Sequence, residues 1–470
     1  MKAYHQIRLL RTAIQIVTAA VLAVSTAIGV PCLLARMQIV TAIVASSVCW
    51  LLFWAAMTMI FGRVYCSTVC PTGFLLDIFG RLRGRRHYLW SRPRPAVRMA
   101  FLVLFAACFV AGVMSVVGLL DPYGAFTRIV TACVRPMTIG AGGLLVAVLT
   151  LAVIAVSGLR RGRLICNTVC PVGSLLGLIS RRSLYHADIN TDLCVNCGRC
   201  ADVCKAECID LTDHVVDASR CVICFDCMDV CPNEAMTYRR GRHRLSMPMM
   251  QRVAGPGIAP VESEISTPSA QPRPIDRRRF IMTGTVVAAT TFSLAADNLK
   301  NICGAGGRSL RPLNYVTPPG AASREDYLQR CTGCGVCAAA CPSGVLRMSS
   351  GRLGLKHVLT PYMDFGSDYC RTDCVACTEV CPTGALSPLT RAEKRRFVIG
   401  KARIAIENCI LYTDATPCGV CQRSCPFKAI VIKKTDDGRQ APDVVMADCT
   451  GCGMCESHCP SQAIIIEGTE

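Results

Sequence analysis

Residues 194–232 read CVNCGRCADVCKAECIDLTDHVVDASRCVICFDCMDVCP, and this stretch decides the fold of the region around it. It contains the pattern C-x2-C-x2-C-x3-C twice, at Cys194, Cys197, Cys200 and Cys204, and at Cys221, Cys224, Cys227 and Cys231. In this spacing three thiolates on one tight loop hold one [4Fe–4S] cluster, and the fourth Cys reaches across to a second cluster. The pattern predicts one cluster on Cys194, Cys197, Cys200 and Cys231, and another on Cys221, Cys224, Cys227 and Cys204.

The stretch resembles the bacterial two-cluster ferredoxins, with two departures. Cys204 is followed by Lys205, where proline is usual, and Cys208 lies only four residues further on. Either cysteine can supply the fourth ligand, and Cys204 is favoured because its interval matches the pattern. A zinc knuckle is the less favoured alternative, since it does not use a third Cys at this interval.

Composition limits the class of protein. The chain has 470 residues, of which 52% are hydrophobic, and a mean hydropathy of +0.39, so membrane spans and about three domains are expected. The 34 Cys are too many for free thiols and indicate bound metal. The formal charge of +19 counts every Cys as neutral, whereas six or seven clusters would remove about 12 to 14 charges. We therefore expect membrane lipid, and no nucleic acid, as a partner.

Four long uncharged runs predict four membrane-spanning helices, since each exceeds the roughly 20 residues that a bilayer core requires. They cover residues 12–35, 37–62, 99–120 and 136–159. A signal peptide is the alternative for the first run, and its length argues against it. The loop between the second and third runs carries eight Arg, against two in residues 121–135. The positive-inside rule then places the N-terminus and the first ferredoxin module in the cytoplasm.

The membrane half contains an internal repeat. Residues 62–73 read GRVYCSTVCPTG, and residues 162–173 read GRLICNTVCPVG. Both copies follow an even-numbered predicted span, so Cys66, Cys70, Cys166 and Cys170 are expected to converge at one depth. These four thiols are candidates for a seventh [4Fe–4S] cluster, with a structural or redox-inactive role as the alternative.

A linker and an export-like segment follow the first ferredoxin module. Residues 241–275 are rich in Pro and Ser and predict a linker. Residues 276–282 read DRRRFIM and precede an uncharged run, which resembles a twin-arginine export signal inside the chain. The alternative is an ordinary fifth span with a basic flank. Export in the folded state fits a domain whose clusters are assembled first, and we expect the segment to remain as a fifth helix.

The last part of the chain carries four more cysteine sets, two regular and two with a longer first gap. Proline follows each fourth Cys and fixes the backbone there. Crossed pairing predicts four clusters, held by Cys331, Cys334, Cys337 and Cys381; by Cys370, Cys374, Cys377 and Cys341; by Cys409, Cys418, Cys421 and Cys459; and by Cys449, Cys452, Cys455 and Cys425. Disulfides are the less favoured alternative, because closely spaced cysteines on one loop rarely form a bridge framework.

Two family resemblances follow from these motifs. Residues 1–245 resemble the NapH-type membrane ferredoxins, a group that includes MauN, NosR and CcoG, and residues 276–470 resemble the twin-arginine ferredoxins NapG and MauM. The chain is thus expected to be an α+β multidomain membrane protein that fuses the two types in the bacterial inner membrane. The expected domains are a four-helix transmembrane domain (1–184), a cytoplasmic two-cluster ferredoxin (185–240), a linker (241–275), a twin-arginine or fifth transmembrane helix (276–298) and an exported four-cluster domain (299–470).

The resemblance to NapH and NapG implies quinol oxidation, with electrons passed to a periplasmic reductase or cytochrome. Catalytic residues and a quinone site are not evident in the sequence. The alternative is a redox maturation factor, which resembles CcoG in copper reduction or NosR in maintaining a periplasmic reductase. A ferredoxin relay without a catalytic site of its own is a third interpretation.

Overall fold

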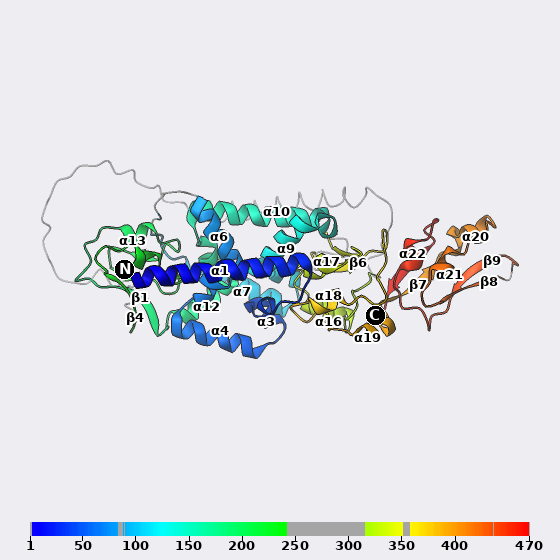
Figure 1. Ribbon diagram of the computed structural model, residues 1–470, viewed down its shortest axis with the longest axis horizontal. Coiled ribbons are helices and arrows are strands. Elements are labelled where there is room, and N and C mark those ends of the chain that lie inside the picture. Colours follow the sequence, from blue (N-terminus) through cyan, green and yellow to red (C-terminus); the bar gives the residue numbers. More distant parts are fainter. Residues whose placement is uncertain are drawn as a thin grey trace. The chain divides into compact units, whose positions relative to one another are not determined.

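The N-terminal run forms one long helix, α1 (Lys2–Ile28), which passes alongside most of the helical region (Figure 1). The computed structural model describes residues 2–82, 88, 90–241, 315–350, 358–435 and 437–469. The predicted linker and twin-arginine segment lie outside these residues and remain predictions. Helices and short antiparallel strands both occur in the described part, as the α+β prediction requires.

Two helices are long and apolar enough to cross a membrane, Tyr4–Ile28 within α1 and Gly142–Arg161 within α10 (Pro136–Arg161). Both correspond to predicted spans. Helix α10 is kinked near its start at Gly140, whose φ is +68°. Length and composition therefore support two of the four spans, and a domain of four continuous spans is not confirmed.

The second and third predicted spans are each broken into two helices. Residues 37–62 form α3 (Ile39–Val44) and α4 (Val48–Phe61), and residues 99–120 lie in α7 (Pro95–Val110) and α8 (Met114–Leu120). The breaks occur where Ser46 and Gly112 adopt positive φ, of 53° and 70°. Uncharged composition predicts burial in an apolar medium, but it does not report a left-handed residue that ends a helix. The first predicted span is also interrupted, because α1 ends at Ile28 and a separate short helix, α2, covers Leu33–Arg36.

The internal repeat appears as two matching helical units. Helix α4 leads into α5 (Val64–Thr68) and α6 (Pro71–Leu82), and α10 leads into α11 (Leu164–Thr168) and α12 (Pro171–Ser180). Gly62 and Gly162 make the turn with positive φ in each copy, a conformation that glycine adopts at little cost. Helix α9 (Pro122–Val134) lies between the copies in sequence, and its N-terminus is capped by Asp121.

The first ferredoxin module is a small pseudo-symmetric fold. Strand β1 (Tyr185–Ile189) pairs antiparallel with β4 (Met236–Arg240), and β2 (Ile209–Asp210) pairs with β3 (Val215–Val216). One short helix follows each cysteine loop, α13 (Arg199–Asp202) and α14 (Asp226–Asp229). This is the arrangement predicted from residues 194–232.

The C-terminal region repeats this arrangement. Its strand pairs are β5 (Leu346–Met348) with β6 (Pro361–Met363), β7 (Gly400–Ile404) with β10 (Ile464–Gly468), and β8 (Ile430–Lys434) with β9 (Gln440–Val444). The helices are α16 (Arg324–Arg330), α17 (Val336–Ala340), α18 (Ala376–Glu379), α19 (Arg391–Arg396), α20 (Ile410–Thr413), α21 (Val420–Ser424) and α22 (Met454–Ser457), with a 3₁₀ turn at Ile406–Asn408.

Helix α1 contacts both the first ferredoxin module and the C-terminal region. Near its start, Arg8 forms a 2.5 Å ion pair with Asp229, which His5 also contacts at 3.0 Å. Near its end, Gly29 lies so close to Ala340 of α17 that a Cβ on Gly29 would approach Ala340 to 2.7 Å. One helix of membrane-spanning length therefore separates two ferredoxin regions.

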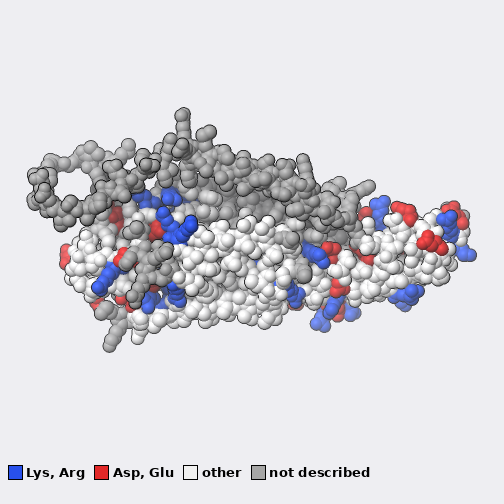
Figure 2. Space-filling model, turned by 90° about the horizontal axis from the view of Figure 1, so that it is seen from above, with Lys and Arg blue, Asp and Glu red and all other residues white. Residues whose placement is uncertain are grey.

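The surface along the helices is apolar. Large apolar side chains are exposed on α1, α4, α7 and α10, among them Val17 (60%), Leu52 (65%), Val110 (86%) and Val153 (59%). Figure 2 shows one face on which uncharged surface lies between two regions that carry Lys, Arg, Asp and Glu. Exposed apolar surface of this extent is typical of a protein that contacts lipid or a partner.

Candidate metal centres

The first module has two cavities lined by cysteines, and their linings cross between the two motifs. One cavity is lined by Cys194, Cys197, Cys200 and Cys231. The other is lined by Cys204, Cys208, Cys221, Cys224 and Cys227. Burial, with a smaller contribution from the neighbouring Cys231, raises the pKa of Cys200 to about 11. Thiols in such a site lose their protons only with a compensating cation, which iron supplies.

Both candidates for the fourth ligand of the second cavity line it. The Sγ atoms of Cys204 and Cys208 are 3.5 Å apart. The hydrogen bond from Cys208 lowers the pKa of Cys204 to about 7, whereas the pKa of Cys208 is raised well above its usual value. Cys204 is thus the more easily ionised thiol of the pair.

The C-terminal sets also meet in crossed groups. One cavity is lined by Cys425, Cys449, Cys452 and Cys455. Burial raises the pKa of Cys331 to about 12, with a further contribution from Cys381, and it raises the pKa of Cys421 to about 11, with contributions from Cys409, Cys418 and Cys459. Cys370 lies beside Cys341 and Cys374 in the remaining group, where burial raises its pKa to about 11. The structure therefore brings together the partners that crossed pairing predicts.

Neighbouring sets of cysteine ligands lie close enough for the thiols of one set to shift the pKa of thiols in the next. Burial raises the pKa of Cys227, and Cys200 of the adjacent group contributes to that shift. Burial likewise raises the pKa of Cys337, and Cys377 of the adjacent group contributes to that shift. Between the two C-terminal pairs, the backbone N–H of Cys370 donates a 2.9 Å hydrogen bond to the carbonyl of Cys452.

The four cysteines of the membrane repeat also converge. Cys66, Cys70 and Cys166 are buried, with 5%, 6% and 6% of their surface exposed. Burial raises the pKa of Cys70 well above its usual value, and Cys66, Cys166 and Cys170 add to the shift. Among the described residues, no three His, Cys, Asp or Glu are grouped closely enough to hold a single metal ion. A four-iron cluster places each iron at its own corner, so its thiolates stand farther apart than those around one ion.

Two buried arginines connect the copies of the repeat. Arg63 donates to the carbonyl oxygen of Cys166 at 3.2 Å, and Arg163 donates to the carbonyl oxygen of Cys66 at 2.5 Å. Both arginine side chains are fully buried. Gly73 faces Cys66, and a Cβ on it would lie 2.6 Å from that carbonyl oxygen. Each arginine therefore holds the cysteine loop of the other copy, whereas Gly73 lies against the loop of its own copy.

The two arginines differ in their charge partners. Arg163 forms a bidentate pair with Asp77, at 2.9 and 2.7 Å. Gly177 occupies the position equivalent to Asp77, and the Arg98 side chain fills the space beside it. Among the described residues no carboxylate is within ion-pair distance of Arg63, whose Nη2 instead lies 3.7 Å from the Sγ of Cys66.

The Sγ atom of Cys66, and no carboxylate of the described residues, faces the guanidinium of Arg63. Burial lowers the pKa of Arg63, but Cys66 and Cys166, which favour the cation wherever they are thiolates, outweigh that effect, and the net shift is upward. A buried guanidinium without a carboxylate partner is costly unless an anion faces it. The sequence motif contained this arginine in both copies, but its spacing alone did not indicate a role as counter-ion.

Comparisons with known proteins agree with this geometry. A family model described as a 4Fe-4S dicluster domain matches residues 330–385 and 416–463, and one described as a 4Fe-4S binding domain matches residues 43–88 and 143–187. The second match covers both copies of the membrane repeat. No solved structure matches the chain.

Three curated relatives are ferredoxin-type proteins. The methylamine utilization ferredoxin-type protein MauM of Methylophilus methylotrophus is 34% identical over 183 residues, which cover 38% of this chain and 75% of MauM. Ferredoxin-type protein NapF of Escherichia coli K12 is 33% identical, over 29% of this chain and 76% of NapF. NapG of the same strain is 31% identical, over 32% of this chain and 63% of NapG. The chain therefore belongs to the family of ferredoxin-type [4Fe–4S] proteins that includes MauM and NapF.

Proposed function

We propose that the chain carries electrons across a membrane, from quinol to an acceptor outside the cytoplasm. Twenty-four cysteines would hold six [4Fe–4S] clusters in the crossed sets described above, with Cys204 as the fourth ligand of the second cluster. Cys66, Cys70, Cys166 and Cys170 would hold a seventh. When bound, each cluster takes up and gives back one electron at a time.

The observation that carries the proposal is the buried four-thiol site beside Arg63. This site lies between the two ferredoxin regions along α1, because Arg11 of α1 donates to the carbonyl of Ser67 at 3.0 Å, next to Cys66. Leu22, eleven residues further along α1, shares an apolar cluster with Cys334. At about 1.5 Å per residue, the helix covers roughly 16 Å between these levels, about half of a bilayer core. A redox site at this depth divides the crossing into shorter steps.

The residues around the four thiols fit a cluster. A cluster bound by four thiolates carries a net charge of about −2, and the cationic Arg63 faces it. The match of the 4Fe-4S binding domain to both copies of the repeat supports the same assignment. The chain's own contribution is to position the thiols and to supply the compensating charge, which stabilises the reduced state.

The C-terminal region would receive the electrons on the opposite side. Helix α9 meets it where the Thr127 hydroxyl donates to the carbonyl of Cys334 at 2.8 Å. Arg128 and Arg135 also donate to the carbonyls of Gly333 and Cys341. We propose that this region lies in the periplasm of a bacterial inner-membrane protein and docks a reductase or cytochrome. The apolar helices and the basic loop at residues 63–98 support that orientation.

Direct reduction by quinol tests the proposal. Purified protein in lipid is mixed anoxically with a menaquinol analogue while cluster absorbance is followed. Bleaching with quinol alone is expected. Bleaching only after a partner subunit is added would identify a relay without a quinol site. Failure with quinol, combined with rapid reoxidation of dithionite-reduced protein by Cu(II), would favour the maturation role.

A further inference from the structure

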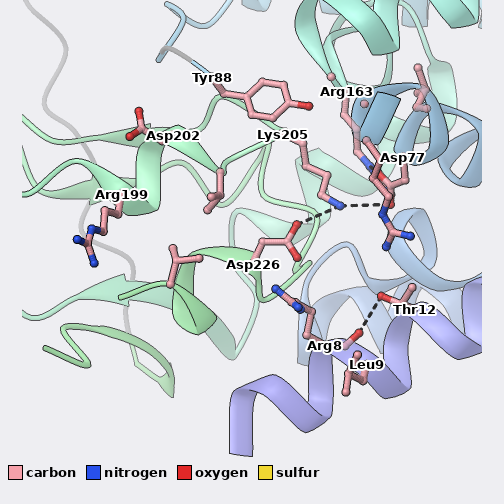
Figure 3. A pocket seen from close by; sticks show the side chains of 16 residues that line it. Arg8, Leu9, Thr12, Asp77, Tyr88, Arg163, Arg199, Asp202, Lys205 and Asp226 are labelled. Atoms are coloured by element: carbon pink, nitrogen blue, oxygen red, sulfur yellow. Dashed lines mark hydrogen bonds and ion pairs between the residues drawn. The ribbon is translucent and has the colours of Figure 1, made fainter. Parts of the chain in front are cut away.

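A large pocket lies between the helical region and the first ferredoxin module (Figure 3). Its volume is about 870 Å³, within the range of sites that bind small organic ligands. The lining comes from α1, α6, the turn after α10 and the cysteine-rich loops of the module. Six of the lining residues give the pocket its polar and apolar sides: Leu9, Leu76, Asp77, Tyr88, Arg163 and Lys205.

The polar wall of the pocket presents an acceptor beside a donor. Asp77 is 7% exposed, and Lys205 Nζ lies 3.4 Å from its Oδ2 and 3.0 Å from Oδ2 of Asp226. Burial raises the pKa of Asp77, but the charges of Arg163 and Lys205 outweigh this effect and the net shift is downward. The pocket therefore offers an ionised carboxylate that accepts hydrogen bonds and an ammonium that donates them.

Another part of the wall is apolar and reaches the exposed side of α1. Leu76 is buried at the base of the pocket, and Tyr88 adds an aromatic ring. Leu9 lines the pocket while 53% of its surface is exposed on α1. A ligand with a flat polar head and an apolar tail fits this shape, with the head at Asp77 and the tail extending out of the pocket past Leu9.

The charges of the pocket distinguish a neutral head group from an anionic one. Five cations line it, as would suit a lipid phosphate, but three of them are already paired with carboxylates, and the carboxylates of Asp77, Asp202 and Asp226 line the same space. Phosphate oxygens would be repelled by these carboxylates. A hydroquinone is neutral, its hydroxyls donate to a carboxylate, and the quinone carbonyl accepts from an ammonium.

The pocket also adjoins two of the candidate cluster sites. Arg163 bridges Asp77 to the carbonyl of Cys66 in the membrane repeat. Lys205 directly follows Cys204 in the chain, so it joins the pocket to the first ferredoxin module. Hydroquinone loses two electrons, and each cluster accepts one. A pocket between two one-electron acceptors suits a two-electron donor.

We propose that this pocket binds the head group of quinol, with Asp77 accepting from a hydroxyl and Lys205 donating to the carbonyl that forms. The inference rests on the proposed function. In the reaction one hydroquinone becomes one quinone, two electrons pass to two oxidised [4Fe–4S] clusters, and two protons leave through the open side of the pocket to water.

Binding of a quinol-site probe to the oxidised, cluster-loaded protein tests the site without turnover. The probe is heptyl-hydroxyquinoline N-oxide, whose fluorescence falls on binding. Asp77→Asn and Leu9→Trp should each weaken binding by about tenfold or more, because the first loses a hydrogen bond to a charged group and the second narrows the mouth. Leu10→Trp is the matched control for the mouth, since Leu10 is 63% exposed and does not line the pocket.

A second control addresses the loss of a buried carboxylate. Asp188 is 6% exposed and paired with Arg239, away from the pocket, so Asp188→Asn should bind the probe like the wild type. If the Asp77→Asn variant loses iron, probe binding by the Leu9→Trp variant tests the site by itself. Unchanged probe binding in Leu9→Trp would overturn the site. Displacement of the probe by phosphatidylglycerol but not by menadione would also overturn it, in favour of a lipid head group.

The outcomes separate the site from the proposed function. Wild-type protein that is reduced by menaquinol, with Leu9→Trp reduced at the same rate, would leave the function standing and reject this site. Probe binding that depends on Asp77 and Leu9, in a protein that menaquinol does not reduce, would support the site and reject quinol oxidation as the function.

Discussion

The guanidinium of Arg63 donates a hydrogen bond of 3.2 Å to the carbonyl oxygen of Cys166, one hundred residues away in the chain. This contact crosses the internal repeat and places at the four-thiol site a cation that has no carboxylate partner among the described residues. Two charges about 7 Å apart interact by about 2 kcal/mol at an effective dielectric constant of about 20. The site should therefore favour the reduced, more negative state of a cluster.

Replacement of this cation should lower the reduction potential of one cluster. For Arg63→Gln we expect a fall of about 100 mV, the one-electron equivalent of about 2 kcal/mol, in an anoxic redox titration followed by electron paramagnetic resonance. The control is the double variant Arg163→Gln/Asp77→Asn, which removes a neutral ion pair and should change this potential much less. Equal shifts in both variants would contradict the role of Arg63 as counter-ion.

The Cys204–Cys208 pair predicts unequal effects of two similar substitutions. Because Cys204 has the lower pKa and the matching interval, Cys208→Ser should retain the wild-type iron and acid-labile sulfide content. Cys204→Ser should lose about four irons, or retain them with an altered paramagnetic signal if Cys208 replaces the missing ligand. Iron loss in Cys208→Ser, with a normal Cys204→Ser, would reverse the ligand assignment.

A single glycine controls how closely α8 approaches the C-terminal region. A Cβ on Gly118 would lie 1.8 Å from the carbonyl oxygen of Thr332, which is backbone and cannot move by itself. Gly118→Ala should force the two apart and slow the reduction of the C-terminal clusters by menaquinol about tenfold or more, because electron tunnelling falls steeply with distance. Leu119→Ala is the control, since 48% of Leu119 is exposed. Unchanged kinetics in Gly118→Ala would argue against this contact as the route.

The buried carboxyl group of Asp121 should make the stability of the folded protein depend on pH. It is 1% exposed, and burial raises its pKa to about 6 although Tyr123 N–H, Gly124 N–H and Arg128 favour the ionised form. Its folded pKa exceeds the unfolded value of about 4, so its contribution is fully present below pH about 4 and is lost as the pH rises through about 6. The loss amounts to about 3 kcal/mol. The melting temperature of the wild type relative to Asp121→Asn should therefore fall between about pH 4 and about pH 7, and parallel curves would contradict this.

The cysteine sets could be predicted from sequence because their chemistry is local. Three thiolates on one loop require fixed intervals, and the duplicated pattern then requires crossed pairing, which the groups around Cys200 and Cys331 display. Convergence of Cys66 with Cys166 could be predicted for the same reason, since a repeat offset by one hundred residues implies a pseudo-symmetric pair.

The rest depends on interactions that no local pattern records. An uncharged run does not reveal that Ser46 or Gly112 ends a helix, so continuous second and third spans were expected where the structure has breaks. The pocket at Asp77 is assembled from α1, α6 and the first ferredoxin module, and Asp77 is distinguished from its counterpart Gly177 only once Arg163 and Arg98 are seen in place.

The most direct test of electron transfer through the four-thiol site compares the wild type with the Cys66→Ser/Cys166→Ser variant in proteoliposomes. Iron and acid-labile sulfide are counted first, and the arrival of electrons in the C-terminal clusters after addition of menaquinol is then followed by freeze-quench paramagnetic resonance. We expect about 28 irons in the wild type and about 24 in the variant, with fast arrival only in the wild type. Equal iron contents and equal arrival rates would contradict a membrane crossing through the four-thiol site.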